Sequence, residues 1–212
     1  MGLGERLLAE VTFTIFASLH QDYGGGENFL HEIQGKIIIR NVDDETEEPA
    51  GEVRAWLVQF NEAQAHGISA RILGDGYSQE ISIYWQELFD GDDFTVEIQK
   101  GWQTGGTDLL IIDSVHIPQK LEVSGIALAA LGRTIDLFSR SCDLVACFPG
   151  GMSYSNDKPD SILREGLNLE GDEEKAIARL KAYCLKSGFR PLGRTGIFLL
   201  NPTHERLDRL LE

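Results

Sequence analysis

The chain has 212 residues, of which 42% are hydrophobic and 25% are charged, and its formal net charge is −15. These values are typical of a soluble globular protein with one well-packed domain, because the chain is short for two. The strong negative charge excludes a basic face for nucleic acid, since it repels phosphate groups, and it mildly favours a cationic ligand such as an amine.

The cysteines and the apolar segments bear on the compartment in which the protein works. Cys142, Cys147 and Cys184 have no disulfide-framework spacing, so we expect free thiols in a reducing compartment. No apolar window is long enough to cross a membrane, and charges interrupt the N-terminal stretch where a signal peptide needs an apolar core. We therefore expect a cytoplasmic protein with no membrane partner.

The first part of the chain predicts three strands. Residues 11–19 are rich in β-branched and aromatic residues, and residues 35–42 and 51–60 predict a strand pair. The connection 43–50 is rich in Asp and Glu, whose oxygens could hold a hard cation. That connection lacks the glycine that a calcium loop needs, so we expect a solvated hairpin tip.

Helices are predicted to follow these strands. Residues 61–89 are helical in pattern, with breaks near Gly67 and at residues 74–76. The last helical piece has an apolar stripe that should face the core, formed by Ile81, Tyr84, Trp85 and Leu88. Residues 91–106 contain scattered charge and glycine, which favours a loop with a short strand around Phe94.

Residues 108–138 predict a strand, a loop and a helix in immediate succession. The apolar run 109–112 suits a strand buried on both faces, and Pro118 ends the strand pattern because its nitrogen has no hydrogen to donate. Gly125 then opens a helix, whose N-terminal backbone N–H groups form an anion site at the positive end of the helix dipole. Apolar residues recur along this helix at helical spacing: Leu128, Leu131, Ile135 and Phe138.

The remaining elements complete an α/β pattern. Residues 143–148 predict a second buried strand, parallel to the first because a helix connects them. Residues 152–171 are polar and irregular. A helix is then expected from an N-cap at Asp172 to a left-handed cap at Gly188, followed by a strand at 196–200.

Two segments of this pattern resemble the GNAT superfamily of acyl-CoA-dependent N-acyltransferases. Residues 115–118 (VHIP) and 122–127 (EVSGIA) are similar to the strand end and the pyrophosphate loop Gln/Arg-x-x-Gly-x-Gly/Ala of that family. Residues 186–193 (KSGFRPLG) are similar to its K-x-G-F-x-P-x-G segment. The resemblance implies a single GNAT-like domain over 1–212, with a mixed, partly parallel central sheet flanked by helices and a CoA-binding core at about 108–201.

The same resemblance implies a donor, an acceptor and a binding site. The donor would be acetyl-CoA, and the acceptor an amine of a small molecule or peptide; a homodimer is left open. The pantetheine arm would pair with backbone groups where the two parallel strands splay apart, and the pyrophosphate would rest on backbone amides of the loop. The cofactor-binding positions implied are Ser114, Val115, Ile117, Lys120, Val123, Ser124, Gly125, Ile126 and Ala127.

Two departures from the family pattern leave an alternative open. Glu122 occupies the Gln/Arg position, where its charge would repel the phosphates and weaken CoA binding between about threefold and about a hundredfold. Cys184 occupies the position of the tyrosine that protonates the departing thiolate. The alternative is therefore a GNAT-fold module that has lost turnover and binds a ligand or a partner.

Three side chains are candidates for the chemistry that acyl transfer needs. His116 and Asp113 are candidate bases on the central strand, and strict alternation along a strand would let only one of them face the cleft. Tyr183, next to Cys184, is the candidate acid for the thiolate. The histidines have no metal-ligand spacing, so no metal site is predicted.

Overall fold

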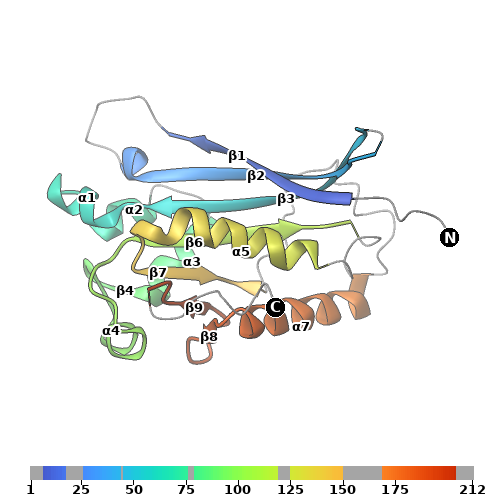
Figure 1. Cartoon of the computed structure of the whole chain (residues 1–212). Helices are drawn as coiled ribbons and strands as arrows, with labels where there is room; N and C mark the ends of the chain where they lie inside the picture. Colours follow the sequence, from blue (N-terminus) through green and yellow to red (C-terminus); the bar gives the residue numbers. More distant parts are fainter. Residues whose placement is uncertain are drawn as a thin grey trace.

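The computed structural model describes residues 7–17, 26–43, 45–75, 79–118, 125–149 and 169–203. Its centre is a seven-stranded sheet with helices on both faces, as Figure 1 shows. The strands are β1 (Leu7–Phe16), β2 (Leu30–Asn41), β3 (Glu47–Val58), β6 (Leu109–His116), β7 (Leu144–Cys147), β8 (Arg190–Pro191) and β9 (Phe198–Leu200). They lie in the order β1-β2-β3-β6-β7-β9-β8.

The sheet is mixed, which confirms the expected α/β fold class. The pair β6–β7 is parallel, and every other neighbouring pair in the order is antiparallel. The helix α5 (Ile126–Phe138) supplies the crossover between β6 and β7, as the sequence predicts. The run 109–112 is fully buried, because helices cover both faces of the sheet at this point.

Both strands of the pair β2–β3 begin earlier than predicted, at Leu30 and Glu47, and they end one and two residues earlier, at Asn41 and Val58. The backbone N–H of Asn41 donates to the carbonyl of Thr46 across the turn at 2.9 Å, and Arg40 Nη2 donates to Glu47 Oε1 at 2.5 Å. The acid-rich connection is therefore a hairpin tip that pairs one of its acids with a cation of the opposite strand. The first strand, β1, begins at Leu7, earlier than the predicted 11–19.

One face of the sheet carries the short helices of the chain's middle. These are η1 (Gly26–Phe29), α1 (Phe60–Ala65), α2 (Ala70–Asp75), α3 (Gln79–Leu88) and α4 (Val96–Trp102), with the two-stranded ribbon β4 (Phe89–Asp90) and β5 (Asp93–Phe94). The predicted break near Gly67 is confirmed, whereas Gly74 and Asp75 of the second predicted break belong to α2 and residue 76 lies outside the described residues. The stripe of α3 is buried in the same core cluster as Leu109 and Ile111 of β6.

The helix α4 corrects the loop predicted for residues 91–106. Ile98 and Trp102 lie one helical turn apart, and both are buried in the core. This packing stabilises a helix that the helix propensity of so short a segment does not predict. Trp102 Nε1 donates to the carbonyl of Leu199 at 3.2 Å, which ties α4 to β9. The short strand at Phe94 is confirmed.

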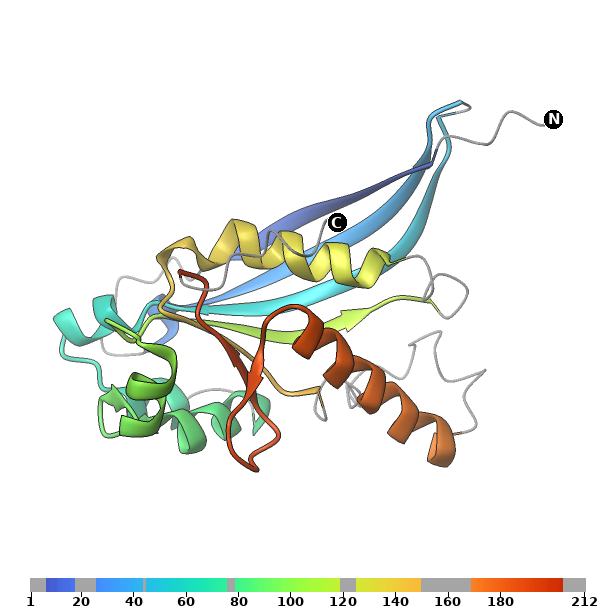
Figure 2. The ribbon, with the colours of Figure 1, turned by 60° about the horizontal axis from the view of Figure 1, so that its bottom comes forward.

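The other face of the sheet is covered by α5 and α7 (Leu169–Lys186), the yellow and orange helices of Figure 2. Leu131 and Ile135 of α5 share a core cluster with Leu110 and Ile112 of β6 and with Cys184 of α7. The 3-10 turn η3 (Ser139–Ser141) then leads from α5 into β7.

The beginning of α7 differs from its prediction, whereas its end does not. The helix begins at Leu169, so Asp172 lies inside it and is not its N-cap. At the other end, Gly188 has φ 87°, the left-handed cap that the sequence predicts. Most of the segment 152–171 lies outside the described residues.

None of the helices in the described ranges combines the length and the apolar character that a membrane span needs.

Candidate functional site

The parallel pair opens into a fork at its carboxyl end. β7 pairs with β6 only from Leu109 to Ile112, where Cys147 is the last partner. β6 continues to His116, and over this extension the described strand that pairs with it is β3. The edge of β6 that faces away from β3 is thereby left without a described strand partner beyond Ile112. The sequence analysis places the pantetheine arm next to this fork, near residues 114–117, and that placement stays a prediction.

A β-bulge lies at the point where the fork opens. Ala55 of β3 lies opposite Ile112 and Arg54 lies opposite Ser114, so Asp113 is an extra residue in β6. Bulges bend a strand, redirect its side chains and are over-represented beside active sites. Here the bulge lies where the pairing of β6 with β7 stops.

The bulge also corrects the expected alternation of Asp113 and His116. Val115 and Ile117 both pack toward α5, so His116 between them points to the opposite face of the sheet. Asp113 reaches that opposite face too, because it forms an ion pair with Arg54. Strict alternation would separate the two candidate bases, and the extra residue brings them to the same face.

The ion pair between Arg54 and Asp113 is the strongest polar contact at the fork. Arg54 Nε donates to Asp113 Oδ2, and the two side chains are 33% and 14% exposed. Arg54 reaches this position from β3, whose side chains alternate between the two faces of the sheet. A partly buried carboxylate thus stands next to a fixed positive charge at the end of β7.

Tyr84 of α3 lies beneath the same point. Burial raises the pKa of Tyr84 well above its ordinary value, and the nearby Cys147, Asp113 and Cys184 act in the same direction, whereas a hydrogen bond with the backbone of Phe148 opposes them. The neutral hydroxyl is therefore retained at every physiological pH. Its neighbours come from both faces of the sheet, because the strand β7 ends here at Cys147.

The second part of the candidate site is the start of α5. Gly125 is exposed at the N-cap with φ 76°, and a side chain placed there would meet open space. No side chain caps the helix at Gly125, and its first turn contains no acidic residue. The positive end of the helix dipole is thus not neutralised by a carboxylate within this turn.

The predicted cofactor-binding residues divide into those that the structure describes and those that it does not. Ser114 and Ile117 are buried in the extension of β6, and Val115 is half-buried between two core clusters. Ile126 and Ala127 are half-buried where α5 packs on the cluster of Ile37 and Ile117. Lys120, Val123 and Ser124, together with Glu122, lie outside the described residues.

The candidate acid and its neighbour lie in α7. Tyr183 is half-buried, while Cys184 is buried with its Sγ 3.3 Å from Sγ of Cys147. Burial and the contact with Cys184 raise the pKa of Cys147 well above its ordinary value. Cys184 therefore packs as a core residue against β7 and is not poised as an acid or a nucleophile.

Sequence reasoning missed Arg54 and assigned Tyr84 to the core alone. The only signal for Arg54 is a charge within an apolar strand pattern, and nothing in the sequence joins it to Asp113 across the sheet. Within the described ranges, no group of three or more His, Cys, Asp or Glu side chains could hold a metal ion.

Comparison with other proteins assigns no family to this chain. Its sequence matches no protein-family model and no curated protein, and its fold matches no solved structure at a significant level.

Proposed function

We propose that the protein is a GNAT-type N-acyltransferase that moves an acetyl group from acetyl-CoA to the amine of a small molecule or peptide. The observation that carries this proposal is the fork between β6 and β7 beside the start of α5 at Gly125. A fork offers backbone groups to an extended pantetheine arm, and a helix start offers amides and a dipole to a pyrophosphate. The end of β6 and the start of α5 flank the loop of one strand–loop–helix unit.

In this proposal the chain binds the donor mainly through its backbone. The pyrophosphate rests on amides of residues 123–127, and the pantetheine arm pairs with the extension of β6 around residues 114–117. Main-chain donors of this kind require little of the side chains, which fits a sequence that keeps Gly125 and varies around it. The loop carries Glu122, so we expect weaker donor binding than a Gln or Arg would give.

The transfer step forms a C–N bond and breaks the thioester C–S bond. The acceptor arrives as an ammonium ion, so a base must remove a proton before the amine nitrogen attacks the carbonyl carbon. We assign this role to His116, since an imidazole titrates near neutrality and Asp113 is already engaged by Arg54. The proton that the departing thiolate gains comes from Tyr183, and the buried hydroxyl of Tyr84 is a second candidate donor.

A second candidate function is a GNAT-fold binding module without turnover. The position of Cys184 favours it, because this thiol is buried against Cys147 where the family has an acidic hydroxyl. Such a module binds a ligand or a protein partner, and it differs from the enzyme in having no turnover. The absence of a disulfide framework supports a cytoplasmic location for either.

Thermal unfolding in the presence of CoA and of acetyl-CoA tests donor binding. Ligand at a hundred times its dissociation constant stabilises the folded protein by roughly 2.7 kcal/mol, which shifts the midpoint by several degrees. Desulfo-CoA should shift it as well, whereas adenosine, which lacks the pyrophosphate, should not. An unchanged midpoint with all CoA forms rejects the acyltransferase and leaves a module that binds another ligand or a partner.

Thiol release in the presence of acetyl-CoA and an amine panel separates the two candidates. Turnover that His116→Ala lowers at least a hundredfold supports the enzyme, and binding without any thiol release supports the module.

Glu122→Gln should tighten CoA binding between about threefold and about a hundredfold, because it removes the repulsion of the phosphates. An unchanged affinity for this variant means that the carboxylate points away from the phosphates.

A further inference from the structure

The strand β1 is an edge of the seven-stranded sheet. It pairs with β2 on one side, and in the part of the chain that the structure describes no strand pairs with its other side (Figure 1). Alternate residues along an edge strand direct N–H and C=O groups outward, where they can pair with another strand. The opposite edge of the sheet, β8, has two residues and one of them is Pro191.

β1 lacks the features that protect edge strands from pairing. It has ten residues, and its register with β2 runs without a bulge from Leu7 opposite Asn41 to Phe16 opposite Glu32. It contains no proline and no lysine, and its one charge, Glu10, lies 3.5 Å from Arg40 of its own sheet. A long, regular and nearly uncharged edge is a site for strand addition.

The exposed side chains of β1 are unusually apolar. Leu8, Ile15 and Phe16 are 52%, 55% and 49% exposed, and they are three of the exposed large apolar residues among the described parts of the chain. They lie near the two ends of the strand. The middle of the strand is different, because Thr12 and Thr14 are exposed there.

We propose that β1 pairs with β1 of a second copy of this chain, in antiparallel orientation and centred on Thr12, so that two sheets join into one. Residues that face each other across an antiparallel pair lie on the same face of the sheet. Centring on Thr12 sets Leu8 opposite Phe16 of the second copy and Ala9 opposite Ile15. Glu10 then faces Thr14, and Val11 faces Phe13.

This register brings together more favourable pairs of side chains than the registers shifted by one step in either direction. It sets every exposed apolar residue of the strand against an apolar residue, and it sets no charge against a like charge. A shift of one register step in one direction places Glu10 opposite Phe16. A shift in the other direction places Leu8 opposite Thr14 and leaves Phe16 beyond the start of the partner strand.

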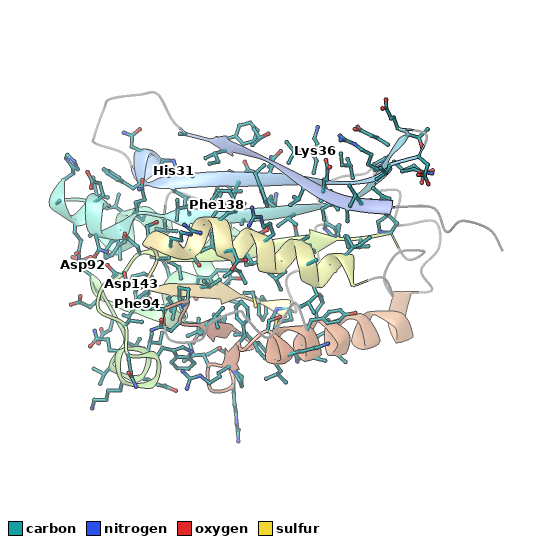
Figure 3. All side chains as sticks on the ribbon, viewed as in Figure 1. His31, Lys36, Asp92, Phe94, Phe138 and Asp143 are labelled. Carbon is teal, nitrogen blue, oxygen red and sulfur yellow. The ribbon has the colours of Figure 1, made fainter. Side chains whose placement is uncertain are left out.

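A two-fold axis at Thr12 gives a sharp test, because any residue at this position faces its own copy. Thr12→Glu places two carboxylates about 5 Å apart across the axis, while within each chain the new Glu faces Lys36, which is labelled in Figure 3. Thr14→Lys is the matched control, since this exposed threonine on the same face would meet Glu10 of the second copy. Its own neighbour on β2 is the neutral Gln34.

Sedimentation velocity of the full chain measures the outcome. We expect the wild type and Thr14→Lys to sediment at micromolar concentration with twice the 23.5 kDa mass of one chain. Thr12→Glu should weaken the dimer between about fourfold and about 300-fold, the range that Coulomb repulsion gives for solvent-like and surface dielectric values. An equimolar mixture of Thr12→Glu and Thr12→Lys should restore the dimer, because opposite charges then meet at the axis.

Three results would overturn the proposal. A monomeric wild type at about 100 μM excludes a stable pairing. A dimer that Thr12→Glu leaves unchanged places the interface elsewhere, and a mixture that does not restore the dimer rejects the axis at Thr12. Circular dichroism of each variant shows whether the sheet itself is intact, so a folding defect is not mistaken for a lost interface.

Discussion

At the scale of single residues, Asp108 and Asp143 at the start of the parallel pair β6–β7 make the stability of the fold depend on pH. The N–H of Asn61 donates to Asp108 Oδ1 at 2.8 Å, and the N–H of Asp108 donates to Asp143 Oδ2 at 3.2 Å. Asp143, labelled in Figure 3, therefore holds the starts of β6 and β7 together. Two carboxylates share this half-buried site, and one of them is costly to ionise.

Burial raises the pKa of Asp108, and the charge of Asp143 adds to the shift although hydrogen bonds from Asn61 oppose it. The folded state therefore binds this proton more tightly than the unfolded state does. The contribution of Asp108 to stability is consequently greatest below its ordinary pKa of 3.8 and falls as the pH rises through the raised native value.

We predict that Asp108→Asn is more stable than the wild type at pH 7 and equally stable at about pH 3, where the wild-type carboxyl is protonated. The amide keeps an oxygen that accepts from Asn61, so the hydrogen bond survives. Urea unfolding across this pH range measures the difference in unfolding free energy between Asp108→Asn and the wild type. A difference that does not change with pH would show that the carboxylate is not destabilised by its surroundings.

The candidate site illustrates what single residues reveal before the fold is known. Gly125 and Pro118 are informative in sequence, because a helix start and a strand end depend on local backbone chemistry. Arg54 and Asp113 are not, because their contact joins two strands that lie 59 residues apart in the chain. No local sequence pattern predicts the bulge that brings Asp113 and His116 to one face of the sheet either.

At the scale of elements, the extension of β6 depends on how closely β3 approaches it. Gly51 has φ 147°, and a Cβ at this position would lie 2.1 Å from the carbonyl oxygen of His116 and 2.7 Å from Cδ1 of Ile117. Only glycine allows these two backbones to meet beside the fork. Gly125 at the start of α5 also has positive φ, but a Cβ there would meet open space.

We predict that Gly51→Ala destabilises the protein by about 3 kcal/mol or more, because both a strained φ and a backbone clash must be relieved. Gly125→Ala should cost only about 1 kcal/mol, which is the strain of the left-handed conformation alone. Urea unfolding of the two variants compares them directly. Equal losses would mean that β3 and β6 can separate at this point without cost.

Elements with strong periodic patterns are predicted well, and short elements are not. The crossover unit of β6, α5 and β7 follows from an apolar run, a proline, a glycine and helical spacing. The helix α4 has seven residues, too few to be stable alone, and forms because Ile98 and Trp102 find a core to enter. Its existence is a property of the packing.

At the scale of the whole molecule, the cysteines report on how tightly α5 and α7 are held to the sheet, because all three lie in the core cluster on that face. Cys142, Cys147 and Cys184 are all nearly inaccessible, at 5%, 1% and 3% exposure. Burial raises the pKa of Cys142 to about 12, so its reactive thiolate is scarce at neutral pH. A thiol reagent can therefore reach these groups only when part of the structure opens.

We predict that a thiol reagent at pH 8 labels the native protein at least a hundredfold more slowly than the urea-unfolded protein, in which all three cysteines react. The reason is that each thiol is shielded in the fold, and burial also raises the pKa of Cys142 and of Cys147. Mass spectrometry of the labelled peptides identifies which cysteine reacts first. Rapid labelling of Cys184 alone would show that α7 leaves the sheet without global unfolding.

The sequence by itself determined the class of fold and the parallel pair with its helical crossover, and it indicated a helix that begins at Gly125. These features depend on local periodicity and on backbone properties of Gly and Pro, and each is contained in a short segment. Only the tertiary structure decided that the pairing of β6 with β7 stops at Ile112, that Asp113 is an extra residue paired with Arg54, and that β1 is left at the edge. Those features arise from pairing between distant strands, and no short segment contains both partners.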